Sequence, residues 1–451
     1  MISEGLNVNR GKIGLQQQPG KVGWISSSVL YAFLVIVILF PAILQSIKNG
    51  FLALIGVCAF WVMFHLNWRL GLHKTVFFWW IFYLCLGLLF IFWGHINGAV
   101  RVLPIIKLYV LYPIAYMVLV TLIRTHGSLV NVLRILIFCT IPMSVLVILQ
   151  VLSVMGLTLP GFEYIVMAFS ENGLTNELSY TPRVLSSLIF LLPFMVGCLA
   201  VYSGKNRPVP RAELWFCTVL SLIAVMVGQR HVLLLILFLT PFILVALASF
   251  LRRKERRNAI LSLVKALFVM AAIAWVAAYS LGGIMGWETH SLLRDFAEAF
   301  DFKHDESAMI RAEQFSALME GVSERPVFGA GLGVGSDKYI RDPEKPWNYE
   351  LRYVALLFQT GIVGFILYMS GVIWILWTGV RVIAARTTLS LHMVPMLAGF
   401  CGALVAEATN PYLNQFGHLW MLFFPVAVIN MWLLDRAQAK KQSIGNFHEC
   451  R

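Results

Sequence analysis

The chain has 451 residues, of which 59% are hydrophobic and only 13% are charged. This balance excludes an ordinary soluble globular protein and is typical of a chain that crosses a membrane many times. The formal net charge is +13. The basic runs adjoin apolar segments, so they are interpreted as residues that set the orientation of membrane helices. A nucleic-acid site is disfavoured, because no basic domain with interleaved aromatic residues exists.

Long apolar runs follow one another along the chain. A transmembrane helix needs about 20 mostly apolar residues to cross a hydrocarbon core ~30 Å thick. The runs predict an all-α integral membrane protein with about twelve transmembrane helices. They lie at about residues 25–46, 50–66, 75–93, 103–122, 129–154, 183–203, 213–229, 231–250, 260–282, 353–380, 391–410 and 417–434. The segment before the first run has no small-residue cleavage site, so we do not expect a removable signal peptide.

The positions of Lys and Arg predict the orientation of these helices. If both termini face the cytoplasm, the inner segments contain 20 of the 35 Lys and Arg residues, including LRRKERR at 251–257. Basic residues in short loops favour the cytoplasmic side of a membrane. We therefore expect nine helices with short loops in 1–282, a large outer loop at 283–352, and three helices with a cytoplasmic tail in 353–451.

Within the large outer loop, the apolar spacing predicts helices at 291–302 and at about 305–322. Arg311 shares a stripe of the second helix with Leu318 and Val322, so its side chain is expected to point toward the membrane domain. It is either a snorkelling or salt-bridged arginine, or a residue that binds a ligand. The apolar side chains expected on one face of this helix are Ala308, Ala312, Phe315, Met319 and Val322.

A glycine-rich stretch, ERPVFGAGLGVGSDKYI, follows the second loop helix. It lacks the GK[ST] ending and the strand–helix context of a nucleotide phosphate loop. Its alternating glycines instead predict a tight turn, where the backbone passes close to other backbone or to a ligand.

The end of the loop reads WNYELRYVALLFQTGIVGF and leads into the tenth apolar run. Tyr349 and Trp347 are of the type that is enriched at membrane interfaces. Glu350 has two interpretations: an ion pair with Arg352 at the start of the helix, or a group that takes part in chemistry.

Five arginines are expected near the outer ends of the helices. Arg230 lies between two apolar runs with almost no loop, and a charge inside a membrane is costly. Guanidinium groups match phosphate oxygens and stay charged, so a diphosphate carried on a lipid best explains this grouping. The alternative, that an arginine only marks the end of a span, is favoured for Arg101. The five are Arg101, Arg183, Arg230, Arg311 and Arg352.

Other polar residues near the outer face give weaker signals. Glu407 either lines a cavity or pairs with an arginine, and His231 either orients a partner or fills space. With Tyr349 and His304, they are the candidates for lining a substrate cavity. No DxD, HExxH or paired CxxC motif occurs, and the loop histidines lack a metal-binding spacing, so we expect no metal and no cofactor.

Four motifs between about 180 and 370 resemble the O-antigen ligase/polymerase superfamily of bacterial envelope enzymes. TPRVLSSLIFLLPF resembles its arginine-led span, and VGQRHVLLLILFL resembles its S/G-x-R-x-x-L-L-L span start. SAMIRAEQFSALMEGVSERPVFGAGLGVG resembles its R-x-x-x-(W/F)…PxxGxGxG loop. NYELRYVALLFQTGIVGF resembles its H/E-x-x-x-L…GxxG span start.

This resemblance implies a GT-C-like fold in the bacterial inner membrane and a metal-independent, inverting glycosyl transfer. The donor would be a glycan on undecaprenyl pyrophosphate, and the acceptor a repeat unit on the same lipid. Arg183, Arg230, Arg311 and Arg352 would bind the pyrophosphate, and Glu350 would accept the proton of the attacking hydroxyl. The implied partners are this lipid-linked oligosaccharide, membrane lipid, a chain-length regulator (polysaccharide co-polymerase) and a flippase, and no nucleic acid.

One difference from the O-antigen ligases favours a polymerase. Ligases of this superfamily usually carry a histidine just before the GxxG span, where this sequence has Tyr349-Glu350. A carboxylate and an imidazole can both act as a base. A polymerase would extend O-antigen or exopolysaccharide chains, whereas a ligase would transfer glycan to lipid A-core. A lipid-linked oligosaccharide transporter or flippase, and a non-catalytic assembly partner, are the remaining alternatives; a transporter more often has two related halves, which are not seen here.

Overall fold

The computed structural model describes residues 21–41, 45–65, 71–154, 186–202, 207–228, 231–285 and 306–449. In these ranges the regular secondary structure is helical, and the only β pairing is an isolated bridge between Ser336 and Tyr339. The expected all-α fold is confirmed for the described residues.

The helices follow the predicted apolar runs in order. The first half contains α1 (Lys21–Leu39), α2 (Gln45–His65), α3 (Lys74–Ile96), α4 (Val102–Ile106), the π-helical turn η1 (Lys107–Leu111), α5 (Tyr112–Leu122) and α6 (His126–Val154). The second half contains α8 (Leu188–Val201), α9 (Arg211–Val227), α10 (His231–Ala248), α11 (Arg253–Met285), α13 (Glu306–Glu324), α14 (Arg352–Ala384), α15 (Thr388–Glu407) and α16 (Trp420–Glu449). Two short 3₁₀ turns, η3 (Tyr412–Asn414) and η4 (Phe416–His418), join α15 to α16.

Six of the described helices are long and apolar enough to cross a membrane: α3, the continuous α4–η1–α5 segment, α6, α14, α15 and α16. Shorter apolar helices of 10–17 residues occur within α1, α2, α8 and α10. The chain is therefore a membrane protein, and the exact number of twelve spans stays a prediction. The predicted end of the first run, at 46, was wrong: α1 ends at Leu39, two residues before Pro41, because proline disfavours a helical residue before it.

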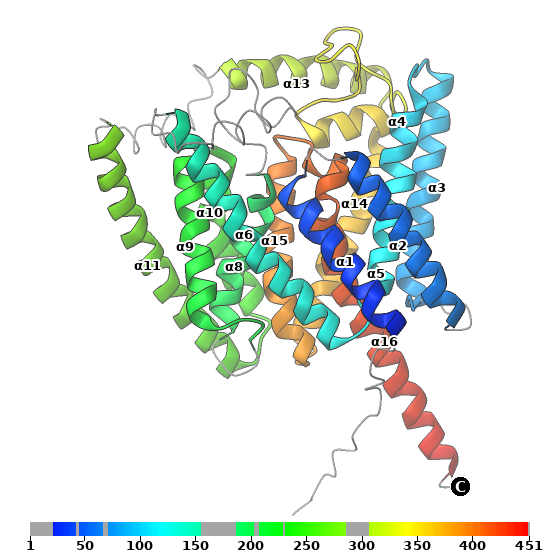
Figure 1. Cartoon of the computed structure of the whole chain (residues 1–451). Coiled ribbons are helices and arrows are strands. Elements are labelled where there is room, and N and C mark those ends of the chain that lie inside the picture. Colours follow the sequence, from blue (N-terminus) through cyan, green and yellow to red (C-terminus); the bar gives the residue numbers. More distant parts are fainter. Residues whose placement is uncertain are drawn as a thin grey trace, which may run out of the picture.

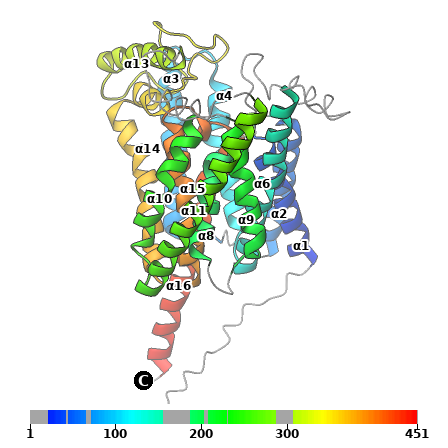
Figure 2. The ribbon, with the colours of Figure 1, turned by 90° about the vertical axis from the view of Figure 1, so that its left-hand side faces the viewer.

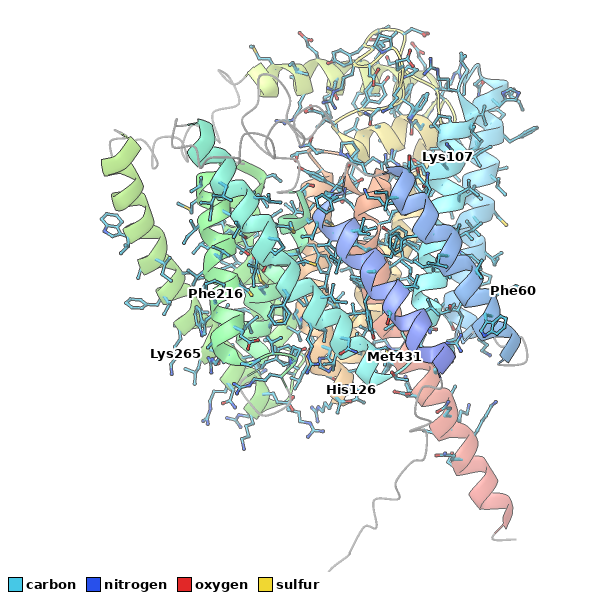
Figure 3. All side chains as sticks on the ribbon, viewed as in Figure 1. Phe60, Lys107, His126, Phe216, Lys265 and Met431 are labelled. Carbon is cyan, nitrogen blue, oxygen red and sulfur yellow. The ribbon has the colours of Figure 1, made fainter. Side chains whose placement is uncertain are left out.

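The long helices form a bundle, and α13 lies across one end of it (Figures 1 and 2). We call this end, at the top of both views, the loop end. The last part of α16 projects from the opposite end. All residues of α8 are buried, as expected for a helix that is apolar on every side. Large side chains such as Phe60 and Phe216, each 58% exposed, lie on the outside of the bundle, where lipid would contact them (Figure 3).

The glycine-rich stretch fastens the loop to the bundle through backbone contacts. Helix α14 is interrupted at Gly361, whose φ of 62° and ψ of −175° are not helical. The interruption frees backbone groups that pair with the 326–332 segment. Ala330 N and Gly331 N donate to the carbonyls of Phe358 and Gln359 at 2.9 and 2.7 Å. Ile362 N and Val363 N donate to the carbonyls of Pro326 and Val327 at 2.9 and 3.2 Å.

On its other side the same segment contacts α3. Leu332 N donates to Phe90 O at 2.9 Å, and the Trp93 indole donates to Gly329 O at 3.1 Å. A Cβ atom at Gly331 would lie 2.2 Å from Gly94 Cα, so only glycine permits this approach. The prediction that the glycines mark backbone passing close to backbone is confirmed.

The burial of side chains on α13 agrees with the expected stripe of Arg311, Leu318 and Val322, but not with the whole of the expected apolar face. Leu318 is buried and Val322 and Arg311 are partly buried, as the shared stripe predicts. Phe315 and Met319, which were expected on the apolar face, are 50% and 37% exposed. The buried face is rotated toward residues 311, 314 and 318, because these positions meet the segment that enters α14. The predicted helix at 291–302 lies outside the described residues.

Candidate active site

Glu350 lies at the end of the loop, two residues before α14 begins, and its carboxylate is held by two arginines. Arg311 Nε from α13 lies 2.9 Å from Glu350 Oε2, and Arg341 Nη2 from the loop lies 2.8 Å from Glu350 Oε1. The backbone N–H of Glu350 donates to Gln314 Oε1 at 3.0 Å. The Glu350 side chain is 15% exposed. The carboxylate is therefore fixed in place and still reachable.

This arrangement corrects one interpretation and adds two residues. Glu350 does not pair with Arg352, because Glu350 precedes the helix and faces α13, whereas Arg352 is the first helical residue and is buried in the bundle. Arg341 and Gln314 were not expected from the sequence. They come from irregular loop and from the middle of a helix, and neither stands in a motif that signals contact with Glu350.

Tyr349 has a structural role next to the carboxylate. Its hydroxyl accepts a hydrogen bond from Ser336 N at 2.5 Å and donates to Tyr339 O at 3.4 Å. The residue is 1% exposed, and burial raises the pKa of the Tyr349 phenol above its ordinary value. The buried ring therefore stabilises the fold of the loop, and its expected place in a substrate cavity stays a prediction.

A second pair of charges, Arg352 and Glu407, lies inside the loop end of the bundle. Arg352 Nε is 3.8 Å from Glu407 Oε1, and both side chains are below 10% exposed. Arg352 Nη2 donates to the Tyr109 hydroxyl, and the guanidinium lies 5.8 Å from the centre of that ring. Glu407 Oε2 accepts from Leu413 N at 2.7 Å. Pairing with an arginine, one of the two roles considered for Glu407, is therefore present in the structure.

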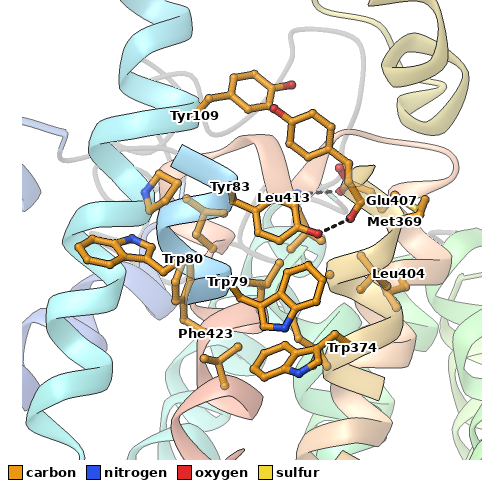
Figure 4. Close-up of a pocket in the computed structure, with 18 of the residues that line it drawn as sticks. Trp79, Trp80, Tyr83, Tyr109, Met369, Trp374, Leu404, Glu407, Leu413 and Phe423 are labelled. Carbon is orange, nitrogen blue, oxygen red and sulfur yellow. Dashed lines mark hydrogen bonds between the residues drawn. The ribbon is translucent and has the colours of Figure 1, made fainter. Parts of the chain in front are cut away.

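This second pair forms one end of a cavity of about 240 Å³. We call it the aromatic cavity (Figure 4). In the close-up, Tyr109 and Glu407 lie in the upper part, and Trp374 and Phe423 in the lower part. The lining residues come from α3, η1, α5, α14, α15, η3 and α16. The polar and aromatic ones are Trp79, Trp80, Tyr83, Tyr109, Arg352, Tyr353, Tyr368, Trp374, Glu407, Asn414 and Phe423.

Arg101 belongs to a separate surface pair. It contacts Glu344 of the loop, and the two side chains are 48% and 70% exposed. The Arg101 guanidinium holds the pKa of the Glu344 carboxyl below its ordinary value. An exposed pair of this kind contributes little to stability. The expectation that Arg101 serves the end of a span, and not the ligand, fits this position.

The remaining candidates lie outside the described residues. These are Arg183, Arg230 and His304; His231 begins α10, but its side chain is not described. The three described arginines of the predicted group all lie near the loop end, and each has a different carboxylate partner. These three arginines therefore do not share a carboxylate in the described part of the chain.

Residues 215–369 match the model of a protein family described as O-antigen ligase. The match runs from α9 into α14 and includes Arg311, Arg341, Glu350 and Arg352. It confirms the resemblance to the O-antigen ligase/polymerase superfamily. A comparison with curated proteins gave no match.

Proposed function

We propose that the protein is a polysaccharide polymerase of the bacterial inner membrane. It transfers a glycan from undecaprenyl pyrophosphate to a lipid-linked repeat unit on the periplasmic face. The family match supports glycan transfer of the O-antigen ligase or polymerase type in general. The observation that carries the proposal is the Glu350 carboxylate held between Arg311 and Arg341 within the matched segment.

The charges of this group suit an anionic substrate. Two guanidinium groups face one carboxylate, so the three side chains together carry a net positive charge. Guanidinium groups form strong paired hydrogen bonds with phosphate oxygens as well as with carboxylates. In the proposed complex the diphosphate replaces the carboxylate on Arg311. The arginine then stabilises the negative charge that grows on the leaving group, and no metal is needed for this task.

The release of Glu350 from Arg311 prepares it to act as the base. A hydroxyl oxygen of the acceptor sugar attacks the anomeric carbon of the donor sugar, and the bond from that carbon to the pyrophosphate oxygen breaks. Undecaprenyl pyrophosphate leaves with the bonding electrons, and Glu350 takes the hydroxyl proton. A single displacement of this kind inverts the anomeric carbon. Arg341 keeps the second carboxylate oxygen in position.

The residue at position 350 favours extension of lipid-linked chains over transfer to lipid A-core. The resemblance to the ligases leads one to expect a histidine at this place, and the chain has a carboxylate. We therefore assign the acceptor as a repeat unit on undecaprenyl pyrophosphate. Transfer to lipid A-core is the second candidate, because the matching family is described as O-antigen ligase.

The test is a transfer reaction with purified protein in lipid nanodiscs. The substrate is an undecaprenyl-pyrophosphate-linked repeat unit, and the products are a ladder of longer glycans and free undecaprenyl pyrophosphate. General-base help contributes typically ~10²–10⁴-fold, so Glu350→Gln should slow the transfer by about that factor. The matched control is Glu344→Gln, which removes the other arginine-paired carboxylate of the same loop at an exposed site.

The outcomes separate the alternatives. A ladder that disappears in Glu350→Gln and persists in Glu344→Gln supports the proposal. If chains appear only after lipid A-core is added, the protein is a ligase. If the lipid-linked unit crosses a vesicle membrane and no new glycosidic bond forms, the protein is a transporter. If Glu350→Gln transfers glycan at the normal rate, the base is another residue.

A further inference from the structure

We propose that the aromatic cavity binds the first part of a polyprenyl chain, with the lipid-side phosphate on Arg352. This inference rests on the proposed function and assigns a site to the lipid portion of the substrate. The protein must hold a lipid whose charged head reacts in water and whose tail lies in the membrane. The aromatic cavity likewise has charged groups at one end and mostly apolar walls elsewhere.

The charged groups lie at one end of the cavity. Arg352 and Glu407 are at the loop end, since Arg352 begins α14 and Glu407 ends α15. On α14 the lining extends from Arg352 to Ile375, a separation of 23 residues. The lining crosses the interruption of α14 at Gly361, and away from Arg352 and Glu407 most of the lining side chains are apolar or aromatic. A soluble sugar would leave its hydroxyl groups unpaired against such a wall, whereas a hydrocarbon chain would not.

The head end of the cavity has unused hydrogen-bonding capacity. Tyr368 lines the cavity, and its Oη is buried without a hydrogen-bond partner in the described part of the chain. Its ring lies 6.1 Å from that of Tyr109, which accepts a hydrogen bond from Arg352. The 3.8 Å between Arg352 and Glu407 exceeds the ~2.7–2.9 Å of a charge-assisted hydrogen bond. A phosphate oxygen at this place would give the Arg352 guanidinium a closer anionic partner.

The deeper wall fits a single unsaturated chain. Trp79 stacks near Tyr83, with ring centres 5.9 Å apart, and lies 5.7 Å from Trp374. Such rings present large flat apolar surfaces, onto which planar isoprene units can pack. The volume of about 240 Å³ is below the ~300–1,000 Å³ of a pocket for a whole small molecule. It holds part of one chain, and the rest of the tail lies in the bilayer.

The position of the head agrees with the proposed chemistry. Glu350 and Arg352 are two residues apart, so their Cα atoms are at most ~7.6 Å from each other. A pyrophosphate whose lipid-side phosphate lies on Arg352 can direct its sugar-side phosphate toward Arg311. The donor sugar then lies beside Glu350. The cavity therefore belongs to the donor lipid.

The first test fills the cavity and measures binding without turnover. Val372 lines the cavity, and its neighbour Ile373 is 62% exposed on the outside of α14. The protein in nanodiscs of phosphatidylethanolamine and phosphatidylglycerol is titrated with radiolabelled undecaprenyl phosphate. Val372→Trp should weaken binding at least tenfold, and the control Ile373→Trp should leave it unchanged. Arg352→Gln should weaken binding of undecaprenyl phosphate but not of undecaprenol.

The second test needs no substitution. Undecaprenyl phosphate with a diazirine on its first isoprene units is photolysed with the wild-type protein, and the labelled peptides are identified by mass spectrometry. Labels on residues that line the cavity support the assignment, and labels confined to helices that do not line it overturn it. Equal competition by phosphatidylglycerol would also overturn it, because the cavity would then be an ordinary phospholipid site.

The two proposals can fail separately. If Val372→Trp selectively loses undecaprenyl phosphate while the wild-type protein transfers no glycan, the lipid site stands and the transfer activity falls. If the protein makes polymer and Val372→Trp keeps the wild-type KM for the lipid-linked donor, the transfer activity stands and the lipid site falls.

Discussion

Replacing Gly331 with alanine should loosen the large loop from the bundle. The new Cβ would lie 2.2 Å from Gly94 Cα. An ordinary Cβ contact begins at 3.4 Å, so the loop and α3 must separate by about 1.2 Å. A shift of that size would stretch the 2.9 Å hydrogen bond from Leu332 N to Phe90 O beyond the normal limit of ~3.2 Å.

The expected cost has two parts. A buried N–H left without its partner costs ~1–3 kcal/mol. The φ of Gly331 is 99°, and a side chain in left-handed backbone adds ~1–2 kcal/mol. The sum is ~2–5 kcal/mol. Gly98→Ala is a matched control, because its φ is 96° and no atom lies within 4 Å of the new Cβ. Gly98→Ala should therefore lose only the ~1–2 kcal/mol that a side chain in left-handed backbone costs.

Hydrogen exchange of the purified protein in nanodiscs measures the difference. The amides of residues 330–332 should exchange faster in Gly331→Ala than in Gly98→Ala. The extra ~1–3 kcal/mol lost in Gly331→Ala corresponds to exchange that is faster by a factor of ~5–150, because 1.4 kcal/mol is a tenfold change. Equal exchange in the two variants would refute the reasoning, since it would mean that the close approach of the two backbones carries no energy.

Three further predictions concern the site and the topology. Arg341→Ala should lower kcat by ~10–150-fold and leave KM for the lipid-linked donor nearly unchanged, because a hydrogen bond to a charged group contributes ~1.5–3 kcal/mol; a changed KM with normal kcat would contradict this positioning role. Arg230→Ala should abolish polymer with normal protein levels in the membrane, and Arg230→Lys should rescue it poorly, because an ammonium cannot form the paired bonds of a guanidinium; full activity of the lysine variant would show that only charge matters there. In a background without reactive native cysteines, Ile340→Cys should react with an impermeant thiol reagent on intact cells and Lys254→Cys should not, and the reverse pattern would invert the predicted orientation.

The positions of the helices could be predicted because each apolar run is a local property of the sequence. The stripe that contains Arg311, Leu318 and Val322 could also be predicted from spacing alone. The exposure of Phe315 could not, because the rotation of α13 depends on the segment that enters α14. A helix with apolar residues on more than one side has no unique buried face until its neighbour is known.

The ion-pair partners of the charged residues could not be predicted from the sequence. Glu350 could be singled out from the sequence as a polar group just before α14, but its nearest basic residue in sequence, Arg352, is not its partner. Arg352 pairs with Glu407, 55 positions later, and Glu350 pairs with Arg311, 39 positions earlier. The aromatic cavity is likewise lined by residues from helices that are distant in the sequence, so no local sequence pattern predicts it.

The interruption of α14 at Gly361 has a consequence for how the protein enters the membrane. Without the 326–332 segment, two carbonyls and two N–H groups of α14 would be unpaired, and each unpaired group costs several kcal/mol in hydrocarbon. Helix α14 alone is therefore a poor candidate for lateral release into lipid. The segment that pairs with it is synthesised before it, so it is available when α14 emerges. Membrane insertion of α14 and docking of the loop should thus occur as one coupled step of biogenesis.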